Sequence, residues 1–115
     1  MRYMIIVRAS PESEAGILPT REAFARMHAF NATMVKAGVM LAAEGLHPSA
    51  EGARIRFDAG GYTVIDGPFT GTKELIAGFW LIEVASREEA VAWMSRAPFD
   101  GGAEIEVRRV FEMDA

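Results

Sequence analysis

The sequence contains no cysteine. Disulfide bonds, thiolate zinc sites and cysteine nucleophiles are therefore excluded. The sequence also lacks any apolar run that approaches the ~18 residues needed for a membrane-spanning helix. Its first residues have strand character and lack the basic flank and long apolar segment of a secretory signal. These absences predict a soluble, cytoplasmic protein without a membrane partner.

Positive charge is also scarce. There are 12 basic and 16 acidic residues, which gives a formal net charge of −4. A general nucleic-acid binder needs a basic face that displaces counterions from phosphates, so nucleic acid is not expected as a partner. Arg54, Arg56, Arg108 and Arg109 could form a local positive patch, although solvated strand faces explain them more simply.

The chain has 115 residues, half of them hydrophobic. This length is typical of one domain with one sizeable core, so residues 1–115 are predicted to be a single domain. Apolar spacing predicts strands at residues 1–8, 39–43, 53–58, 62–65, 76–84 and 103–111, helices at 20–37 and 86–97, and a loop at 9–19.

Two spacing patterns predict which side chains are buried. In the first helix, a stripe at helical spacing is expected to face the core; it comprises Phe24, Met27, Asn31, Met34 and Val35. In the strand at 53–58, alternation predicts that Ala53, Ile55 and Phe57 face inward. The strands at 1–8 and 76–84 are apolar on both faces, which favours central positions in the sheet.

The element order is strand, helix, strand, hairpin, strand, helix, strand. Two such halves resemble a split βαβ unit, so we predict an α+β, ferredoxin-like antiparallel sheet with an inserted hairpin and two helices on one face. Two helices leave the other apolar face of the sheet bare, and a bare apolar face promotes association. A homodimer formed through the open sheet face is therefore expected.

Four sequence features, in order, resemble one family. They are Asp66-Gly67-Pro68-Phe69, Thr72-Lys73-Glu74, Gly78-Phe79, and the terminal strand from Glu104 to Arg108. Together they are similar to the DGPF branch of the YCII-related proteins. The resemblance implies a dimeric α/β-barrel type of ferredoxin-like fold and a function that is mostly unassigned.

The resemblance also implies where chemistry would take place. The broader family pairs a histidine on the first helix, matched here by His28, with an aspartate before the proline that follows the second helix. That position is Ala97 in this sequence, so the pair cannot be carried over. Asp66 or Glu44 would then have to orient the His28 ring.

The candidate site residues follow from these considerations. A metal bound by His28, His47 and Glu44 has no supporting motif spacing, so neither metal nor cofactor is expected. Lys73 would hold an anion or act as a base, or else form an ion pair with Glu74, Glu104 or Glu106. The predicted catalytic residues are His28, Asp66 and Lys73, and the predicted substrate-binding residues are Glu44, Phe69 and Glu74.

Two functional hypotheses remain. The first is a small-molecule enzyme that carries out acid/base or elimination chemistry, with His28 as acid/base, Lys73 as electrostatic stabiliser and Asp66 as orienting group. The second is a non-catalytic dimeric module that binds a small molecule or a protein. If His28 has only a structural role, it is expected to be a half-buried helix residue that is hydrogen-bonded to the main chain.

Overall fold

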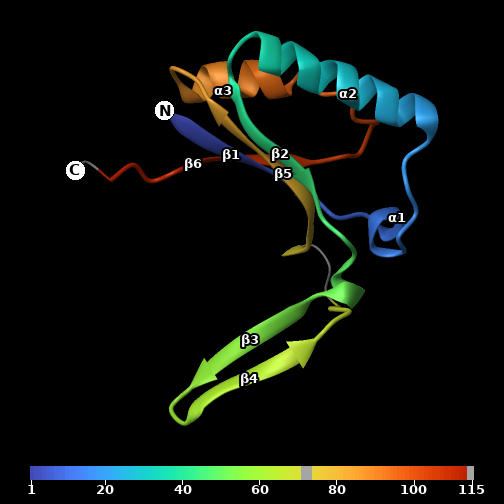
Figure 1. Ribbon diagram of the computed structural model, residues 1–115, viewed down its shortest axis with the longest axis vertical. Coiled ribbons are helices and arrows are strands. Elements are labelled where there is room, and N and C mark those ends of the chain that lie inside the picture. The colour runs from blue at the N-terminus through green and yellow to red at the C-terminus, as the bar shows by residue number, and fades with distance from the viewer. Residues whose placement is uncertain (71–73, 114–115) are drawn as a thin grey trace.

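The computed structural model describes residues 1–70 and 74–113. In these residues, the strands of the main sheet lie in the order β2-β5-β1-β6, and every neighbouring pair is antiparallel (Figure 1). The strands are β1 (Arg2–Arg8), β2 (Met40–Gly45), β5 (Ile76–Glu83) and β6 (Ile105–Arg109). The chain is thus an α+β protein with an antiparallel sheet, and this strand order is compatible with a ferredoxin-like fold.

Helices α2 (Arg21–Lys36) and α3 (Arg87–Met94) lie on the same side of the sheet (Figure 1). Thr20 caps α2 by accepting a hydrogen bond from the Ala23 N–H. Ser86 caps α3 in the same way through the Glu89 N–H, while the Glu89 carboxylate accepts from the Ala85 N–H. Both predicted helices are confirmed. No helix in residues 1–70 and 74–113 is long and apolar enough to cross a membrane.

The core lies between these helices and the inner face of the sheet. Side chains along β1 and β5 alternate between the two faces of the sheet. On the inner face, Tyr3 lies opposite Ile82 and Ile5 lies opposite Trp80. This confirms the central position predicted for both strands. The buried hydrophobic residues are Tyr3, Ile5, Phe30, Met34, Val39, Trp80, Ile82, Val84, Ala90 and Met94.

The predicted buried stripe of α2 was partly wrong. Phe24 is 66 % exposed and Val35 is 61 % exposed, whereas Phe30, which the stripe omitted, is buried. The residues of α2 that face the core or the smaller cavity are Met27, Phe30, Asn31 and Met34. They again recur at helical spacing. Apolar residues surround much of this helix, so its own periodicity permits more than one stripe. Packing against the sheet selects one.

The segment predicted as a loop at 9–19 contains a short helix, α1 (Pro11–Glu14). Ser10 Oγ accepts from the Ser13 N–H, and Ser13 Oγ accepts from the Ser10 N–H. Pro11 occupies the first turn, where its missing N–H has no helical partner to lose. The prediction failed because a serine replaces the glutamate or glutamine of the usual capping box.

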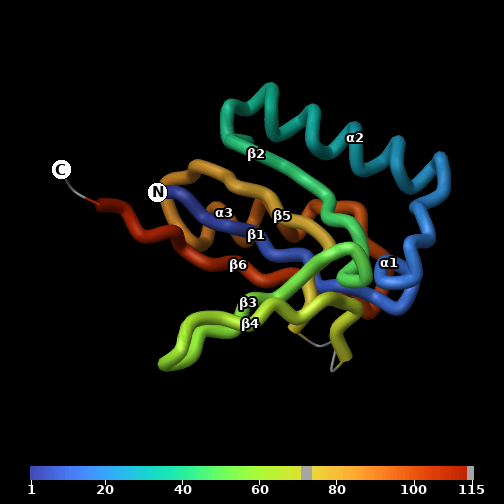
Figure 2. The backbone as a smooth tube through the Cα atoms, turned by 60° about the horizontal axis from the view of Figure 1, so that its bottom comes forward, coloured from blue at the N-terminus to red at the C-terminus, as the bar shows by residue number. Residues whose placement is uncertain are grey.

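The predicted hairpin is present, but it does not join the main sheet. Strands β3 (Ala53–Asp58) and β4 (Gly61–Asp66) form a separate two-stranded sheet after the short 3-10 turn η1 (Ser49–Glu51). Figures 1 and 2 show it projecting from the body on the side away from the helices. The prediction that Ala53, Ile55 and Phe57 face inward is therefore wrong for this chain, because all three side chains are exposed.

Beside β1, charged side chains on β6 make the sheet sensitive to acid. Glu106 accepts hydrogen bonds from Arg108 at 2.8 Å and from Arg8 at 3.3 Å. The hydrogen bond from Arg108 lowers the pKa of Glu106, while partial desolvation opposes that shift.

A carboxyl group whose pKa is lower in the folded state stabilises the fold above its unfolded pKa. That stabilisation is lost as the pH falls through the folded value. Lowering the pH from 6 to below about 4 should therefore reduce the melting temperature of Glu106→Gln less than that of the native protein. Thermal melts followed by circular dichroism would measure this. Arg108→Gln should also show a smaller drop in melting temperature on acidification. An equal drop in all three proteins would contradict a stabilising Glu106–Arg108 hydrogen bond.

Candidate ligand-binding site

Two cavities adjoin one another where the inner face of the sheet meets α2 and the connection from α3 to β6. Val7, Ala77 and Phe99 line both, so the two cavities share a wall. The larger has a volume of about 750 Å³ and the smaller about 330 Å³. Sites for small molecules are typically clefts of this size with mostly apolar walls and few polar groups.

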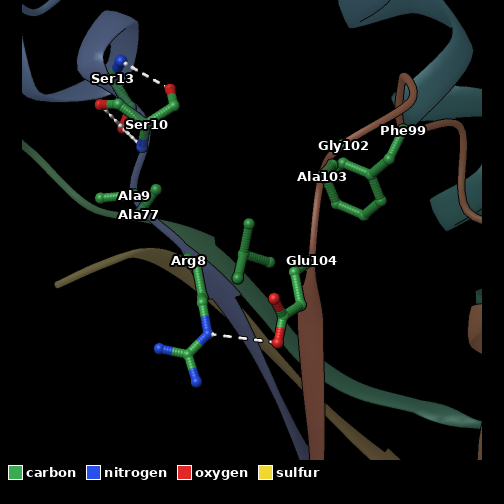
Figure 3. Close-up of a pocket in the computed structure, with 10 residues that line it drawn as sticks. Arg8, Ala9, Ser10, Ser13, Ala77, Phe99, Gly102, Ala103 and Glu104 are labelled. Carbon is green, nitrogen blue, oxygen red and sulfur yellow. Dashed lines mark hydrogen bonds and ion pairs between the residues drawn. The ribbon is translucent and has the colours of Figure 1, made fainter. Parts of the chain in front are cut away.

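The larger cavity is lined by polar residues at the end of β1 and by residues just before the start of β6. Figure 3 shows Arg8 extending toward Glu104, with Ser10 and Ser13 at the opposite side and the Phe99 ring facing the space. The Arg8 guanidinium lies 3.9 Å from the Glu104 carboxylate and 3.3 Å from that of Glu106. Because Ser10 and Ser13 already cap α1, much of the polar lining is engaged within the protein.

The smaller cavity has a more apolar and aromatic wall. Its floor is formed by β5, one side by α2 and the other by β2. It is lined by Val7, Pro19, Met27, Asn31, Ala43, Glu44, Gly45, Ala77, Gly78, Phe79, Trp80 and Phe99. Within this lining, the amide of Asn31 and the carboxylate of Glu44 are the polar side chains.

Trp80 fixes the orientation of Asn31. The indole Nε1–H donates to Asn31 Oδ1 at 2.9 Å. An indole N–H can only donate, so the oxygen of the amide must face it and the amide NH₂ faces elsewhere. Trp80 is 5 % exposed, and the edges of Phe30 and Phe99 meet its ring with centroids 6.1 and 6.0 Å away. The amide is therefore held by a rigid aromatic cluster.

Glu44 lies at the rim of the smaller cavity, opposite Phe79 in the pairing of β2 with β5. Its side chain is exposed and makes no hydrogen bond or ion pair with residues 1–70 or 74–113. Because directly paired residues share a face, the Glu44 side chain lies on the open face of the sheet with Phe79, at the edge strand β2. The substrate-binding role of Glu44 stays a prediction.

The structure does not bring the predicted catalytic residues into either cavity lining. His28 is exposed on α2, one residue after Met27, and makes no hydrogen bond to a described residue. Asp66 is exposed at the end of β4. Lys73 lies outside the described residues. His47 is exposed, and its Nδ1 lies 3.0 Å from the Glu51 carboxylate.

The described part of the loop after Asp66 is tied to η1 and α1. The Phe69 N–H donates to Ser49 Oγ at 3.1 Å, and Ser49 Oγ donates to the Glu14 carboxylate at 2.6 Å. The Arg54 guanidinium lies 3.9 Å from the centroid of the Phe69 ring, a cation–π distance. Phe69 is half-buried and Glu74 is exposed, and neither lines a cavity.

The model of the YCII-related domain matches residues 1–114. The chain belongs to the YCII-related family. An uncharacterized protein of Rhizobium meliloti (strain 1021) is 44 % identical over 57 residues, which are 50 % of this chain and 46 % of that protein. The match therefore spans about half the length of that relative.

Ala97 occupies the position at which, by the resemblance described above, the broader family has an aspartate. In this YCII-related chain Ala97 is half-buried and packs against the core. Its methyl group offers neither a hydrogen bond nor a negative charge to an imidazole. His28 thus has no carboxylate partner from the end of α3.

Sequence reasoning missed Arg8, Trp80 and Phe99 as cavity residues. Asn31 was placed on the buried stripe of α2, and a polar residue in such a stripe signals a specific partner, because an unpaired buried amide is unfavourable. A tryptophan on a central strand supplies that partner here. The pairing spans 49 positions, so no local pattern could have revealed it.

Proposed function

We propose that this YCII-related protein is a non-catalytic, homodimeric module that binds a small aromatic molecule in the smaller cavity. The observation that carries the proposal is the cavity of about 330 Å³ between α2 and β5, with Asn31 held by Trp80 and Glu44 at its rim. Aromatic walls favour a flat apolar ligand, and the carboxylate favours a cationic or donor group at one end.

The alternative is the enzyme, with acid/base or elimination chemistry by His28, Asp66 and Lys73. General acid/base catalysis needs a titratable group within hydrogen-bond reach of the substrate. His28 and Asp66 are exposed and outside both cavity linings, which favours the binding module. The cytoplasmic location and the DGPF branch, supported by Asp66-Gly67-Pro68-Phe69, remain parts of the proposal.

The dimer is proposed to form through the open face of the sheet. On that face Met4 lies opposite Leu81, and Ile6 lies opposite Phe79. All four side chains are only partly buried, although they occupy the two central strands. A second copy would cover them, and a twofold-symmetric pair of chains is the commonest homo-oligomer.

Ligand binding can be measured through Trp80, which lines the cavity. The other tryptophan is Trp93, so a Trp93→Phe background isolates the Trp80 fluorescence. Benzylamine, benzyl alcohol and benzoate are suitable probes because they share a ring and differ in charge. We expect benzylamine to bind most tightly. Glu44→Gln should weaken benzylamine by about two- to fivefold, the effect of one exposed charge pair, and leave benzyl alcohol unchanged.

Two controls separate the hypotheses. Glu22→Gln removes a carboxylate from an exposed position of α2 outside the cavity lining and should leave benzylamine binding unchanged. His28→Ala should leave both probe affinity and dimerisation within about twofold. A loss of probe binding in His28→Ala would favour the enzyme instead. Absence of any probe-dependent change in Trp80 fluorescence would refute the cavity as a binding site.

A further inference from the structure

The β3–β4 hairpin presents an apolar face that none of residues 1–70 or 74–113 covers. In the register of the hairpin, Ile55 lies opposite Val64, and Phe57 lies opposite Tyr62. The exposed fractions are 56 % for Ile55, 53 % for Val64, 79 % for Phe57 and 67 % for Tyr62. Large neighbouring apolar side chains exposed to this extent mark an interaction surface.

The opposite face of the same hairpin is polar except for Ile65, which lies opposite Arg54 near the base. Arg54, Arg56 and Thr63 alternate with the apolar residues, and Arg56 lies opposite Thr63. A hairpin with one apolar and one polar face is built to pack on something through the apolar face and to meet water with the other. This two-faced pattern also provides an internal control, since both faces belong to one element.

Within the described part of the chain, the hydrogen bonds that attach the hairpin lie at its base. At the base, the Gly67 N–H donates to the Gly52 carbonyl at 2.9 Å, and the Phe69 N–H donates to Ser49 Oγ. The extensive contacts of β3 and β4 are with each other. A two-stranded hairpin is at best marginally stable in water by itself. An additional surface is therefore needed to hold the distal part in place.

The surface of the whole chain is too large for an isolated compact protein. It exposes 8526 Å², whereas a folded monomer of this mass exposes about 6,200 Å². The excess of roughly 2,300 Å² exceeds what one partner contributes to an interface of standard size. The radius of gyration, 16.2 Å, also exceeds the value of about 13 Å expected for a compact chain of this length.

We propose that the hairpin is an arm that packs its apolar face on the open sheet face of the partner subunit. The inference rests on the dimer of the proposed function and adds the element that forms it. Each chain carries both an uncovered apolar arm and an uncovered apolar sheet face, on Met4, Ile6, Phe79 and Leu81. Two copies related by a twofold axis can therefore satisfy each other reciprocally, which a single unrelated partner would not do.

The arrangement of the elements suits such an exchange. The hairpin projects beyond the sheet on the side away from the helices, which is also the side of the open sheet face (Figure 1). Arg56 would remain on the outer face of the arm, in water, while Arg54 keeps its contact with the Phe69 ring near the base. Burial of the apolar face would contribute stabilisation in proportion to the apolar area removed from solvent.

The first test compares variants on the two faces of the arm by sedimentation velocity and by light scattering at micromolar concentration. The native chain should be a dimer. The double variant Phe57→Ser, Tyr62→Ser should raise the dimer dissociation constant by at least about a hundredfold, as loss of two aromatic anchors does. The matched double variant Arg56→Ser, Thr63→Ser alters the polar face at adjacent positions and should change it by less than about threefold.

The second test uses the absence of cysteine, which makes introduced thiols unique. Chains carrying Phe57→Cys and separate chains carrying Leu81→Cys are mixed and treated with a bismaleimide linker. Mixed pairs should form covalent dimers of one chain of each kind. Arg56→Cys, on the outer face of the arm, should link to Leu81→Cys at least about fivefold less, because linking requires proximity. Circular dichroism confirms that the arm variants keep the fold.

The outcomes separate the arm from the dimer itself. A dimer that survives Phe57→Ser, Tyr62→Ser, with no linking between positions 57 and 81 on different chains, would overturn the arm and leave the sheet-to-sheet dimer intact. A native monomer would overturn both. A chain that carries both Phe57→Cys and Leu81→Cys tests for contact within one chain. Linking within that chain but not between chains would show that the arm closes on its own sheet, and it would overturn the packing of the arm on the partner subunit.

Discussion

Ile82→Ala should lower the free energy of unfolding by about 2–5 kcal/mol, the range measured for truncation of a fully buried aliphatic side chain. Ile82 is 0 % exposed and lies on β5, where it is opposite Tyr3 of β1 and Met40 of β2. Both neighbouring strands are fixed by their own pairing, so the surroundings cannot collapse into the space. The loss therefore combines missing burial with a persistent cavity. Urea unfolding followed by circular dichroism would measure it.

A matched control lies on the same strand. Ile76 begins β5 and is 39 % exposed, so Ile76→Ala should lower the unfolding free energy by less than about 1 kcal/mol. The difference between the two variants tests burial, because strand, residue type and substitution are the same. Equal effects of Ile82→Ala and Ile76→Ala would contradict the assignment of the core to the inner face of β5.

Gly67→Ala should displace the base of the hairpin. A Cβ built on Gly67 would lie 1.7 Å from the carbonyl oxygen of Ser49 and 2.7 Å from its carbonyl carbon. These are backbone atoms, so no side chain can rotate away to make room. Ser49 also holds Phe69 and Glu14 through hydrogen bonds. A shift at Gly67 therefore disturbs the connection of the loop to both η1 and α1.

We expect Gly67→Ala to cost about 3 kcal/mol or more at this site, at or above the upper end for overpacking in a well-packed region. Hydrogen exchange is the sharper measurement, since the Gly67 and Phe69 amides should lose protection while β1 and β5 amides keep theirs. Gly101→Ala is the control, because a Cβ added to Gly101 would meet nothing within 4 Å. Protection at Gly67 and Phe69 that equals the native value would refute the close approach.

The pattern of success and failure in the sequence predictions follows the range of the interactions involved. Helix α2 was predicted from residue 20 to 37 and observed at Arg21–Lys36, because Thr20 and the terminal residues signal its ends locally. The stripe of α2 was predicted less well. Its phase depends on Trp80 and Phe99, which approach from distant parts of the chain.

The candidate site shows the same division. Glu44 was predicted from the sequence to bind substrate; it lies at a cavity rim, and its role stays a prediction. The described part of the loop after Asp66 is bound by Ser49, which in turn bonds to Glu14. The pairing of Asn31 with Trp80 was not predictable, because neither residue has a local pattern that selects the other.

The sequence by itself determined the family, the order of the strands and helices, the central positions of β1 and β5, and the absence of cysteine chemistry. These properties depend on residue identity and on periodicity within short segments. Tertiary structure alone decided which stripe of α2 is buried, where the cavities lie, and that the hairpin remains outside the main sheet. Alternation within the hairpin specifies an apolar face, but the surface that this face meets depends on contacts between distant residues and, as we propose, between chains.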